Sequence, residues 1–357
     1  MATESTVRPA PLTIGVIGLG YWGPNLLRVL FDLEDIRVKW ICDLEEDRLR
    51  RFARRYPTVG FTTDVETLLE DDELDAVAIA TPVYTHFDLA RQSLEAGKHT
   101  FVEKPLASST DAANQLLDTA AERGLELMCG QTFLYSSAVR TVKQMLDSGE
   151  LGEVFFVSAS RVNLGLHQRD VSVVWDLGPH DFSILLNWFE ERPASVRAVG
   201  RDSIVPGIHD VAFITLRFAS GLVANVELSW LAPSKLRRTV LVASEKMVVY
   251  EDGTAEPIRL FDHGVVYRDP ETFGEYHLSY RTGHIVSPKL DNYEPLSREL
   301  ADFAAAMRGD ISLRRQTLLA RDVVQITEAA ERSLREGGTE VMIPPRVPAL
   351  AHAGPGL

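Results

Sequence analysis

A glycine-rich turn between an apolar run and a helix start constrains this chain most. Residues 13–17 form a short run, rich in β-branched side chains, that is typical of a strand buried on both faces. Gly18, Gly20 and Gly23 follow with the spacing G-x-G-x-x-G. Gly18 permits a tight turn, Gly20 lets the backbone approach a pyrophosphate, and Gly23 lets a helix pack closely on the strand. Pro24 suits the first turn of that helix, so the stretch predicts a dinucleotide-binding strand, turn and helix.

An acidic residue follows at the distance expected for contact with an adenosine ribose. The next apolar run, 38–42, ends at Asp43, about twenty residues beyond Gly23. A carboxylate there hydrogen-bonds the ribose hydroxyls and repels a 2′-phosphate, so the sequence favours NAD over NADP. Two alternatives stay open, because Asp43 also suits a cap for a helix beginning near Glu45, and Arg48 is near enough to soften the preference.

Length and charge narrow the class of protein. The 357 residues suffice for two domains, and 45% hydrophobic residues, 25% charged residues and a net charge of −14 describe a soluble, acidic globular protein. Nucleic acid is excluded as a partner because no run of Lys or Arg offsets that charge. No apolar segment approaches the length of a membrane span, and no Cys/His cluster indicates a metal. Since Cys42 and Cys129 lie in apolar runs and no signal core is visible, we expect a reduced, cytoplasmic protein.

Strand and helix patterns alternate between residues 37 and 130. Strand-like runs occur at 76–80, 99–102 and 125–130, and helical patterns at 45–55, 85–96 and 108–122. This alternation predicts a parallel, doubly wound sheet, which is a Rossmann domain over residues 12–130. In such sheets ligands bind beyond the carboxyl ends of the strands. Thr81 and Pro82 follow one strand, and Glu103 and Lys104 follow the next, so all four are expected near the nicotinamide end of the cofactor.

Longer strands dominate the second half of the chain. They are predicted at 154–161, 195–199, 211–218, 222–230, 238–243 and 247–250. Helical patterns at 136–147, 297–307 and 317–335 precede the sheet, cover it or reconnect it. We therefore expect an α/β chain, with the Rossmann domain followed over residues 131–345 by an α+β domain that has a large, mostly antiparallel open sheet.

Three motifs occur in order along the chain. They are Gly18-Leu19-Gly20-Tyr21-Trp22-Gly23, Glu103-Lys104-Pro105 and Trp175-Asp176-Leu177-Gly178-Pro179-His180-Asp181. Together they resemble the glucose–fructose oxidoreductase, inositol dehydrogenase and rhizopine-catabolism (Gfo/Idh/MocA) family over about residues 12–343. The resemblance implies a pyridine-nucleotide oxidoreductase acting on sugars, cyclitols or related compounds, with a cis Lys104–Pro105 bond. It also implies Tyr21 and Trp22 near the cofactor, and oligomer contacts through the second sheet, hence a homodimer or homotetramer.

The chemistry indicates roles for four residues. Oxidising a secondary alcohol sends a hydride to the nicotinamide while a protein group removes the hydroxyl proton. His180 is the best-matched base, since its reference pKa of ~6.5 lies close to working pH. Asp176, four residues earlier in a predicted helix, shares a face with His180 and orients the imidazole or binds a sugar hydroxyl. Lys104 would hydrogen-bond the reacting oxygen and offset its developing charge, with Glu103 setting its position.

Each assignment has a structural alternative. Asp176 and His180 also suit a helix-surface pair, and Lys104 a solvated charge, although their joint occurrence in one pattern favours catalysis. His86, at the start of a helix, is a candidate cofactor contact or a cap. Trp22 is a cofactor contact or a packing residue against the second domain. Candidate substrate contacts on a preceding strand are Arg161, Asn163 and His167.

Two segments suggest the substrate. Residues 21–25 and 281–289 resemble the branch of the family that oxidises nucleotide-linked sugars at carbon 3, such as UDP-N-acetylglucosaminuronate 3-dehydrogenase. Arg281 and Lys289 would hold a diphosphate or a carboxylate there, unless the segment is an ordinary exposed loop. The alternatives are keto-sugar reduction, as in deoxysugar or antibiotic pathways, and oxidation of a free amino sugar, aminoglycoside or cyclitol. A non-catalytic NAD sensor would instead bind nucleotide without turnover.

Overall fold

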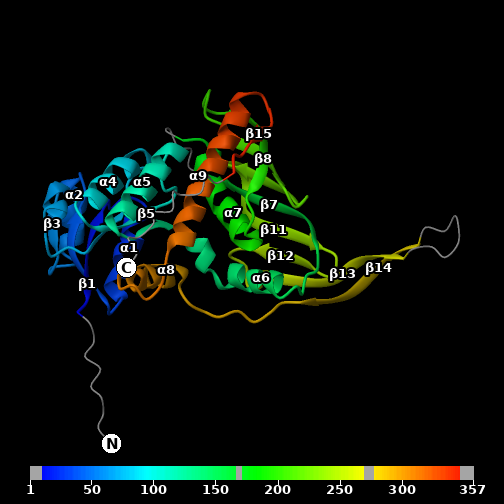
Figure 1. The fold of residues 1–357 in the computed structure, drawn as a ribbon, viewed down its shortest axis with the longest axis horizontal. Helices are drawn as coiled ribbons and strands as arrows, with labels where there is room; N and C mark the ends of the chain where they lie inside the picture. Colours follow the sequence, from blue (N-terminus) through cyan, green and yellow to red (C-terminus); the bar gives the residue numbers. More distant parts are fainter. Residues whose placement is uncertain (1–9, 166–170, 269–276, 346–357) are drawn as a thin grey trace, which may run out of the picture.

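The computed structural model describes residues 10–165, 171–268 and 277–345, which form a parallel and a mixed sheet with their helices (Figure 1). The first sheet has the order β3-β2-β1-β4-β5-β6, and all its pairs are parallel. Its strands are β1 (Leu12–Ile17), β2 (Ile36–Cys42), β3 (Gly60–Thr62), β4 (Ala76–Ile79), β5 (His99–Glu103) and β6 (Leu127–Gly130). Its helices are α1 (Gly23–Asp32), α2 (Glu46–Ala53), α3 (Glu66–Leu69), α4 (Val83–Glu95) and α5 (Thr110–Arg123). The predicted doubly wound sheet is confirmed.

The apolar strand residues explain why both faces of this sheet are covered. Successive side chains of a strand point to opposite faces. In β4, Ala76 and Ala78 join one core cluster, while Val77 and Ile79 join another. A run without polar residues, such as this one, is therefore stable only with helices on both sides.

Helix α8 (Pro295–Met307) lies on the first sheet, although it comes late in the chain. Leu300 and Phe303 belong to the same buried cluster as Val16 and Phe101, and the ring centroids of Phe101 and Phe303 are 5.8 Å apart. We expected this helix to cover or reconnect the antiparallel sheet. Its apolar face instead fills a gap beside α1, so a division of the chain at residue 130 does not describe its packing.

The second sheet has nine strands in the order β14-β13-β12-β11-β7-β10-β9-β8-β15. Among the described strand pairs of this second sheet, only β7–β10 is parallel, and the others are antiparallel. The strands are β7 (Val154–Leu164), β8 (Pro193–Arg201), β9 (Val211–Phe218), β10 (Val223–Ser229), β11 (Leu231–Ala243), β12 (Met247–Glu251), β13 (Ile258–Arg268), β14 (His277–Val286) and β15 (Val341–Met342). The mostly antiparallel sheet was predicted, but β13, β14 and β15 were not. In Figure 1 the pair β13–β14 extends away from the first domain.

Helices cover one face of this sheet. They are the 3₁₀ helix η1 (Thr132–Tyr135), α6 (Ser137–Asp147), α7 (Val173–Phe189) and α9 (Arg314–Arg335). Strand β9 shows the asymmetry, because buried side chains alternate along it with more exposed ones. The sheet therefore has one covered face and one open face, as antiparallel sheets often do.

Helix α9 connects the two halves of the molecule. The Thr317 hydroxyl donates to the Leu127 carbonyl of β6 at 2.5 Å, and further along the Ser333 hydroxyl oxygen accepts from the Ala198 amide of β8 at 2.9 Å. The apolar residues of α9 also contact both domains, because Val324 packs into the first domain and Val323 into the second. The two domains are thus packed against one common helix.

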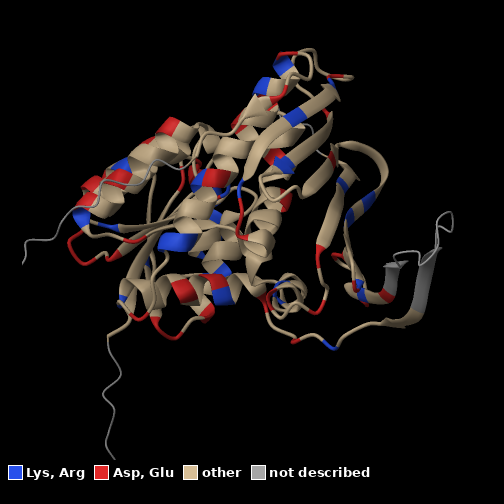
Figure 2. Ribbon diagram, turned by 45° about the vertical axis from the view of Figure 1, so that its right-hand side comes forward, with Lys and Arg blue, Asp and Glu red and all other residues tan. Residues whose placement is uncertain are grey.

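Charged residues are not gathered on one face of the molecule. Figure 2 shows Lys and Arg in both domains, mixed with Asp and Glu. Within the described ranges, no helix is long and apolar enough to cross a membrane, and no group of three or more His, Cys, Asp or Glu side chains is arranged to hold a metal ion.

Candidate active site

The glycine turn has the geometry that a dinucleotide needs. Gly18 has a φ of +96°, and a Cβ atom there would lie 2.6 Å from the Ala80 carbonyl oxygen. A Cβ atom on Gly23 would collide with the Gly18 carbonyl, so packing requires both glycines. Gly20 is exposed, and nothing lies within 4 Å of a Cβ atom built there. The turn therefore leaves open space beside the first turn of α1, whose N-cap residue makes no side-chain capping bond.

Asp43 ties this turn to α2. Its side chain is buried, and it accepts hydrogen bonds from the Leu19 amide at 2.7 Å, the Glu45 amide at 2.9 Å and the Arg48 guanidinium at 3.0 Å. Burial opposes ionisation, but these bonds hold the pKa of Asp43 below its usual value. The carboxylate thus serves the start of α2, and its predicted contact with the ribose stays a prediction. Arg48 pairs with it directly, at the place where it was expected to soften the preference for NAD.

The predicted catalytic residues meet where β5 ends. Lys104 follows β5, and the Lys104–Pro105 bond is cis, as the resemblance implied. The Lys104 Nζ donates to the backbone carbonyl of Asp176 at 2.9 Å and lies 3.8 Å from its Oδ1. His180 is one turn later on α7, and the Lys104 charge acts on it. Lys104 is therefore brought into one partly exposed site with two residues of α7 that lie more than 70 residues later in the chain.

Asp176 contacts Lys104 and Trp230, and its predicted contact with a sugar hydroxyl stays a prediction. Its Oδ2 accepts a hydrogen bond of 2.9 Å from the indole of Trp230, which is buried between β10 and β11. Among the described contacts, none joins Asp176 to the His180 ring. The imidazole packs instead edge-on against Phe133, with 5.0 Å between ring centroids. Asp176 consequently holds Lys104 and Trp230, and Phe133 positions His180.

Burial and charge change the acid–base character of both groups. Burial, together with the positive charges of Lys104, Arg161 and Arg237, lowers the pKa of His180 well below 6.5. The imidazole is therefore neutral at physiological pH and can accept a proton, although it is a weaker base than the reference value suggested. Burial also lowers the pKa of Lys104, against the opposing effect of Asp176 and Glu103.

Glu103 and Glu299 form a buried acidic pair behind Lys104. Glu103 accepts a hydrogen bond of 3.3 Å from the Lys104 amide with one oxygen, while its other oxygen has no partner. Burial raises the pKa of Glu103 to about 8. Glu299, from α8, is fully buried, and burial raises its pKa to about 8, with Glu103 adding to the effect. Glu103 therefore contacts Lys104 through the main chain, and its predicted contact with cofactor stays a prediction.

Glu299 also supports η1. It accepts hydrogen bonds from the Gln131 amide at 2.5 Å and the Thr132 hydroxyl at 2.6 Å. Those residues begin the 3₁₀ helix that carries Phe133. A residue of α8 thus helps to place the aromatic ring against His180.

The remaining cofactor candidates lie around the glycine turn. The Thr81 methyl group packs against Gly18, and Pro82 is exposed at the start of α4. Tyr21 is 91% exposed, whereas Trp22 lies beside Glu103 and packs against the cluster that joins the first sheet to α8. Their contacts with cofactor stay predictions.

His86 is neither a cofactor contact nor a surface cap. It is 1% exposed, and its two ring nitrogens lie 2.8 Å from the backbone carbonyls of Thr81 and Pro105. With both nitrogens engaged, His86 connects the loops that follow β4 and β5. The sequence prediction is wrong because it could not show that these loops close over the imidazole.

The Arg161 side chain is buried and forms an ion pair inside the protein. It is 4% exposed, and its Nε and Nη2 donate to Asp181 at 2.6 and 3.2 Å. The guanidinium lies over the Phe133 ring, 4.7 Å from its centroid. Arg161 is therefore first a structural partner of Asp181, and contact with substrate would depend on its Nη1, which is buried without a partner. Asn163, on the same strand, has a buried Oδ1 without a partner, and His167 lies outside the described residues.

Several residues of the site were missed by sequence reasoning. They are Phe133, Asp181, Trp230, Arg237 and Glu299. Asp181 stood within a motif that was already recognised, and Arg237 belongs to the basic stretch Lys235–Arg238, so both had a visible signal. Phe133, Trp230 and Glu299 had none, because only the folded chain brings them to His180 and Lys104.

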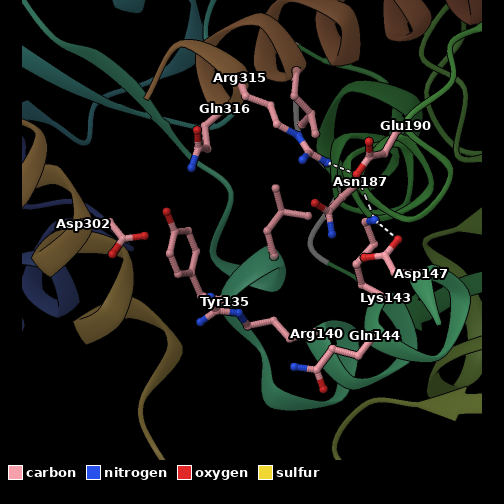
Figure 3. Close-up of a pocket in the computed structure, with 12 residues that line it drawn as sticks. Tyr135, Arg140, Lys143, Gln144, Asp147, Asn187, Glu190, Asp302, Arg315 and Gln316 are labelled. Carbon is pink, nitrogen blue, oxygen red and sulfur yellow. Dashed lines mark hydrogen bonds and ion pairs between the residues drawn. The ribbon is translucent and has the colours of Figure 1, made fainter. Parts of the chain in front are cut away.

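A separate hollow lies between α6, α7, α8 and α9 (Figure 3). Lys143 and Arg315 both pair with Glu190 in it, and Tyr135 faces Asp302 across it. Its twelve lining residues include none of the predicted site residues. It is therefore distinct from the site at Lys104 and His180.

Comparison with known proteins covers both domains. Residues 12–131 match the model described as "Oxidoreductase family, NAD-binding Rossmann fold", and residues 139–249 match "GFO/IDH/MocA C-terminal domain". A dTDP-3,4-didehydro-2,6-dideoxy-alpha-D-glucose 3-reductase of Actinomadura kijaniata is 33% identical over 49% of this chain and 53% of its own length. A UDP-N-acetylglucosamine 3-dehydrogenase of Acidithiobacillus ferrooxidans is 29% identical over 63% of this chain and 69% of its own.

The solved structures extend the likeness to the whole fold. GenD2 from gentamicin A biosynthesis, solved in complex with NAD, has a TM-score of 0.80 and 23% identity, covering 97% of this chain and 100% of that one. The curated relatives, in contrast, are matched over only about half to two thirds of their lengths. The first domain is an NAD-binding Rossmann domain, and two models of one family cover well over half of the chain. The chain belongs to the Gfo/Idh/MocA family of oxidoreductases.

Proposed function

We propose that the protein transfers a hydride between NAD and a secondary alcohol of a sugar, at carbon 3 of a nucleotide-linked sugar. One observation carries this proposal: Lys104, at the carboxyl end of β5, is bound to Asp176 of α7, one turn before His180, on which the Lys104 charge acts. Ala80 directly follows the neighbouring strand β4, and Gly18 of the cofactor turn is packed against it. A substrate held by Lys104 therefore lies at the edge of the sheet where the family binds its cofactor.

The roles of the side chains follow from their contacts. Bound NAD supplies the hydride acceptor. Lys104 donates a hydrogen bond to the substrate hydroxyl oxygen and stabilises the negative charge that develops there. His180, neutral because of its lowered pKa, takes the hydroxyl proton. Asp176 holds the ammonium group of Lys104 in place, and its own position is set by Trp230.

The choice of a nucleotide-linked sugar is supported by relatives, not by the segment first suspected. The 29% identical relative is named as a UDP-N-acetylglucosamine 3-dehydrogenase. Segment 281–289 lies on β14 and just beyond it, at the outer edge of the second sheet, and the side chain of Arg281 lies outside the described residues. That segment therefore adds no support from within one copy of the chain.

Keto-sugar reduction is the second candidate. The 33% identical relative is named as a 3-reductase of a dTDP-linked keto sugar. The same residues serve this direction, with His180 returning a proton to the carbonyl oxygen that Lys104 binds. Spectroscopy at the reduced-nicotinamide band separates the two directions, with NAD plus UDP-sugars, dTDP-sugars, amino sugars and cyclitols, or NADH plus keto sugars.

Loss of either central residue tests the catalytic assignment. We expect Lys104→Ala or His180→Ala to lower kcat at least about a hundredfold, because each removes a group acting on the reacting oxygen or its proton. NAD affinity, measured by calorimetry, should stay within about twofold. Lys235→Ala, an exposed lysine of β11, is the matched control. Unchanged turnover would contradict the assignment, and NAD binding with no turnover of any sugar would favour the sensor.

We also propose that the open face of the second sheet joins copies of the chain into a homodimer or homotetramer. Val199 and Phe213 are direct partners across β8 and β9, and they are 50% and 52% exposed. Phe156 on β7, the register partner of Val223 on β10, is similarly exposed on this face. Apolar side chains so placed favour a protein contact.

A further inference from the structure

Arg237 lies beside the candidate active site, and no role has yet been given to it. It is the register partner of Arg161, on the neighbouring strands β11 and β7. Its guanidinium is 5.6 Å from the centroid of the Phe133 ring, whose edge contact positions His180. Arg237 is therefore one aromatic ring away from the proposed base.

Arg161 and Arg237 differ in their exposure to solvent and in the hydrogen-bond donors that they could offer to a ligand. Arg161 is 4% exposed and engages Asp181 with two nitrogens. The Arg237 side chain is 34% exposed, and its Nη1 donates to Asp252 at 2.8 Å. Asp252, by holding Nη1, fixes the direction of the guanidinium. A planar guanidinium fixed at one end presents its other donors in a defined geometry, which suits a phosphate or carboxylate.

The charge around His180 is positive, although the chain carries a net charge of −14. Lys104, Arg161 and Arg237 are the three charged groups that act on the imidazole. Lys104 and Arg161 already have places in the proposed reaction and in the buried pair with Asp181. Arg237 is the member of this group that is open to solvent and not needed for the hydride step.

We propose that Arg237 recognises an anionic group of the substrate, a phosphate or a carboxylate carried by the sugar. This inference rests on the proposed function in taking a sugar as substrate. An anionic group binds there while the reacting hydroxyl lies at Lys104. The enzyme thereby distinguishes charged sugars from neutral ones with one residue of the second sheet.

Calorimetry with three probes tests this directly. UDP-N-acetylglucosamine carries phosphates, glucuronate carries a carboxylate, and N-acetylglucosamine carries neither. Each is titrated into the NAD-saturated full-length protein. We expect Arg237→Gln to weaken at least one charged probe about ten- to a hundredfold, because a hydrogen bond between charged groups is lost. Binding of N-acetylglucosamine should be unchanged, and Arg237→Lys should restore part of the lost affinity. Which charged probe responds identifies phosphate or carboxylate as the group recognised.

The adjacent Arg238 provides the matched control. Successive residues of a strand face opposite sides, and Arg238 is exposed on the other face of β11. Arg238→Gln should leave all three affinities unchanged. An equal loss in Arg237→Gln and Arg238→Gln, an equal loss for all three probes, or no loss for either charged probe would overturn the inference. If no sugar transfers hydride but a charged probe still binds through Arg237, the proposed function fails and the anion site stands.

Discussion

At the residue scale, burial decides the charge state of the site. His180 and Lys104 have lowered pKa values, whereas Glu103 and Glu299 have raised ones, each with burial as the largest cause. All four shifts favour the neutral form of the group. Burial therefore keeps His180 neutral at physiological pH, and it favours the protonated forms of Glu103 and Glu299, whose pKa values are about 8.

The pH dependence of the reaction follows from His180. A base must be unprotonated, and the low pKa of His180 should keep kcat/KM for oxidation level until well below pH 6.5. Arg237→Gln removes one of the charges that lower this pKa, so the acidic fall in activity should move to higher pH. A pH–rate profile of both proteins measures it. Identical acidic limbs would show that His180 is not the titrating base.

The buried pair of Arg161 and Asp181 gives a stability prediction. Asp181→Asn leaves the buried Arg161 guanidinium without its counter-charge, which should lower the free energy of unfolding by about 3–5 kcal/mol. The double variant Arg161→Met/Asp181→Leu removes both charges and should recover most of that loss. Urea unfolding monitored by circular dichroism measures the difference. A loss below about 1 kcal/mol for Asp181→Asn would mean that solvent reaches the pair.

At the element scale, local pattern and long-range packing contribute differently. The strand, glycine turn and helix from β1 to α1 were predictable because every determinant lies within sixteen residues. The site at Lys104 was predictable because strand ends of a parallel sheet share one edge. The place of α8 was not, since its apolar face fits either domain. The contact of Phe133 with Arg237 was not, because it depends on the register of β7 and β11.

The strand β14 was another element that the sequence pattern did not predict. β14 has the sequence HLSYRTGHIV, in which polar and apolar residues do not alternate regularly. Its pairing with β13 supplies backbone hydrogen bonds that leave no trace in side-chain pattern. A segment suspected of binding substrate was thus found at a sheet edge.

Helix α8 carries a buried acid, Glu299, whose ionisation can be tested through the stability of the protein. The pKa of Glu299 is about 8 in the folded chain against an ordinary 4.5. Between these pH values the folded state binds more protons than the unfolded state, so stability falls as pH rises. Glu299→Gln should remove part of this fall between pH 5 and pH 8, with Glu103 causing the remainder. The urea midpoints of both proteins at pH 5 and pH 8 measure this fall in stability. If the fall is the same in Glu299→Gln as in the wild type, Glu299 is ionised at both pH values.

At the scale of the whole molecule, the proposed assembly through the open sheet face can be tested. Phe213→Asp places a charge among the exposed apolar side chains of β8 and β9 and should convert the oligomer to monomers. Light scattering coupled to size-exclusion chromatography measures the mass. Asp202, exposed outside these strands, offers the control Asp202→Asn. A wild-type chain that is monomeric at micromolar concentration would contradict the proposed oligomer.

Helix α9, packed on β6 at one end and on β8 at the other, has a consequence for turnover. A helix that contacts both domains should restrict a hinge motion between them, and such motions release the product in many two-domain enzymes. We therefore expect product release to depend on the proposed reaction. Once the hydroxyl has become a ketone, His180 holds the proton and donates a hydrogen bond to the ketone oxygen. The low pKa of His180 favours loss of that proton to solvent, and this loss removes one of the two contacts that would hold the product. The reaction itself loosens its product.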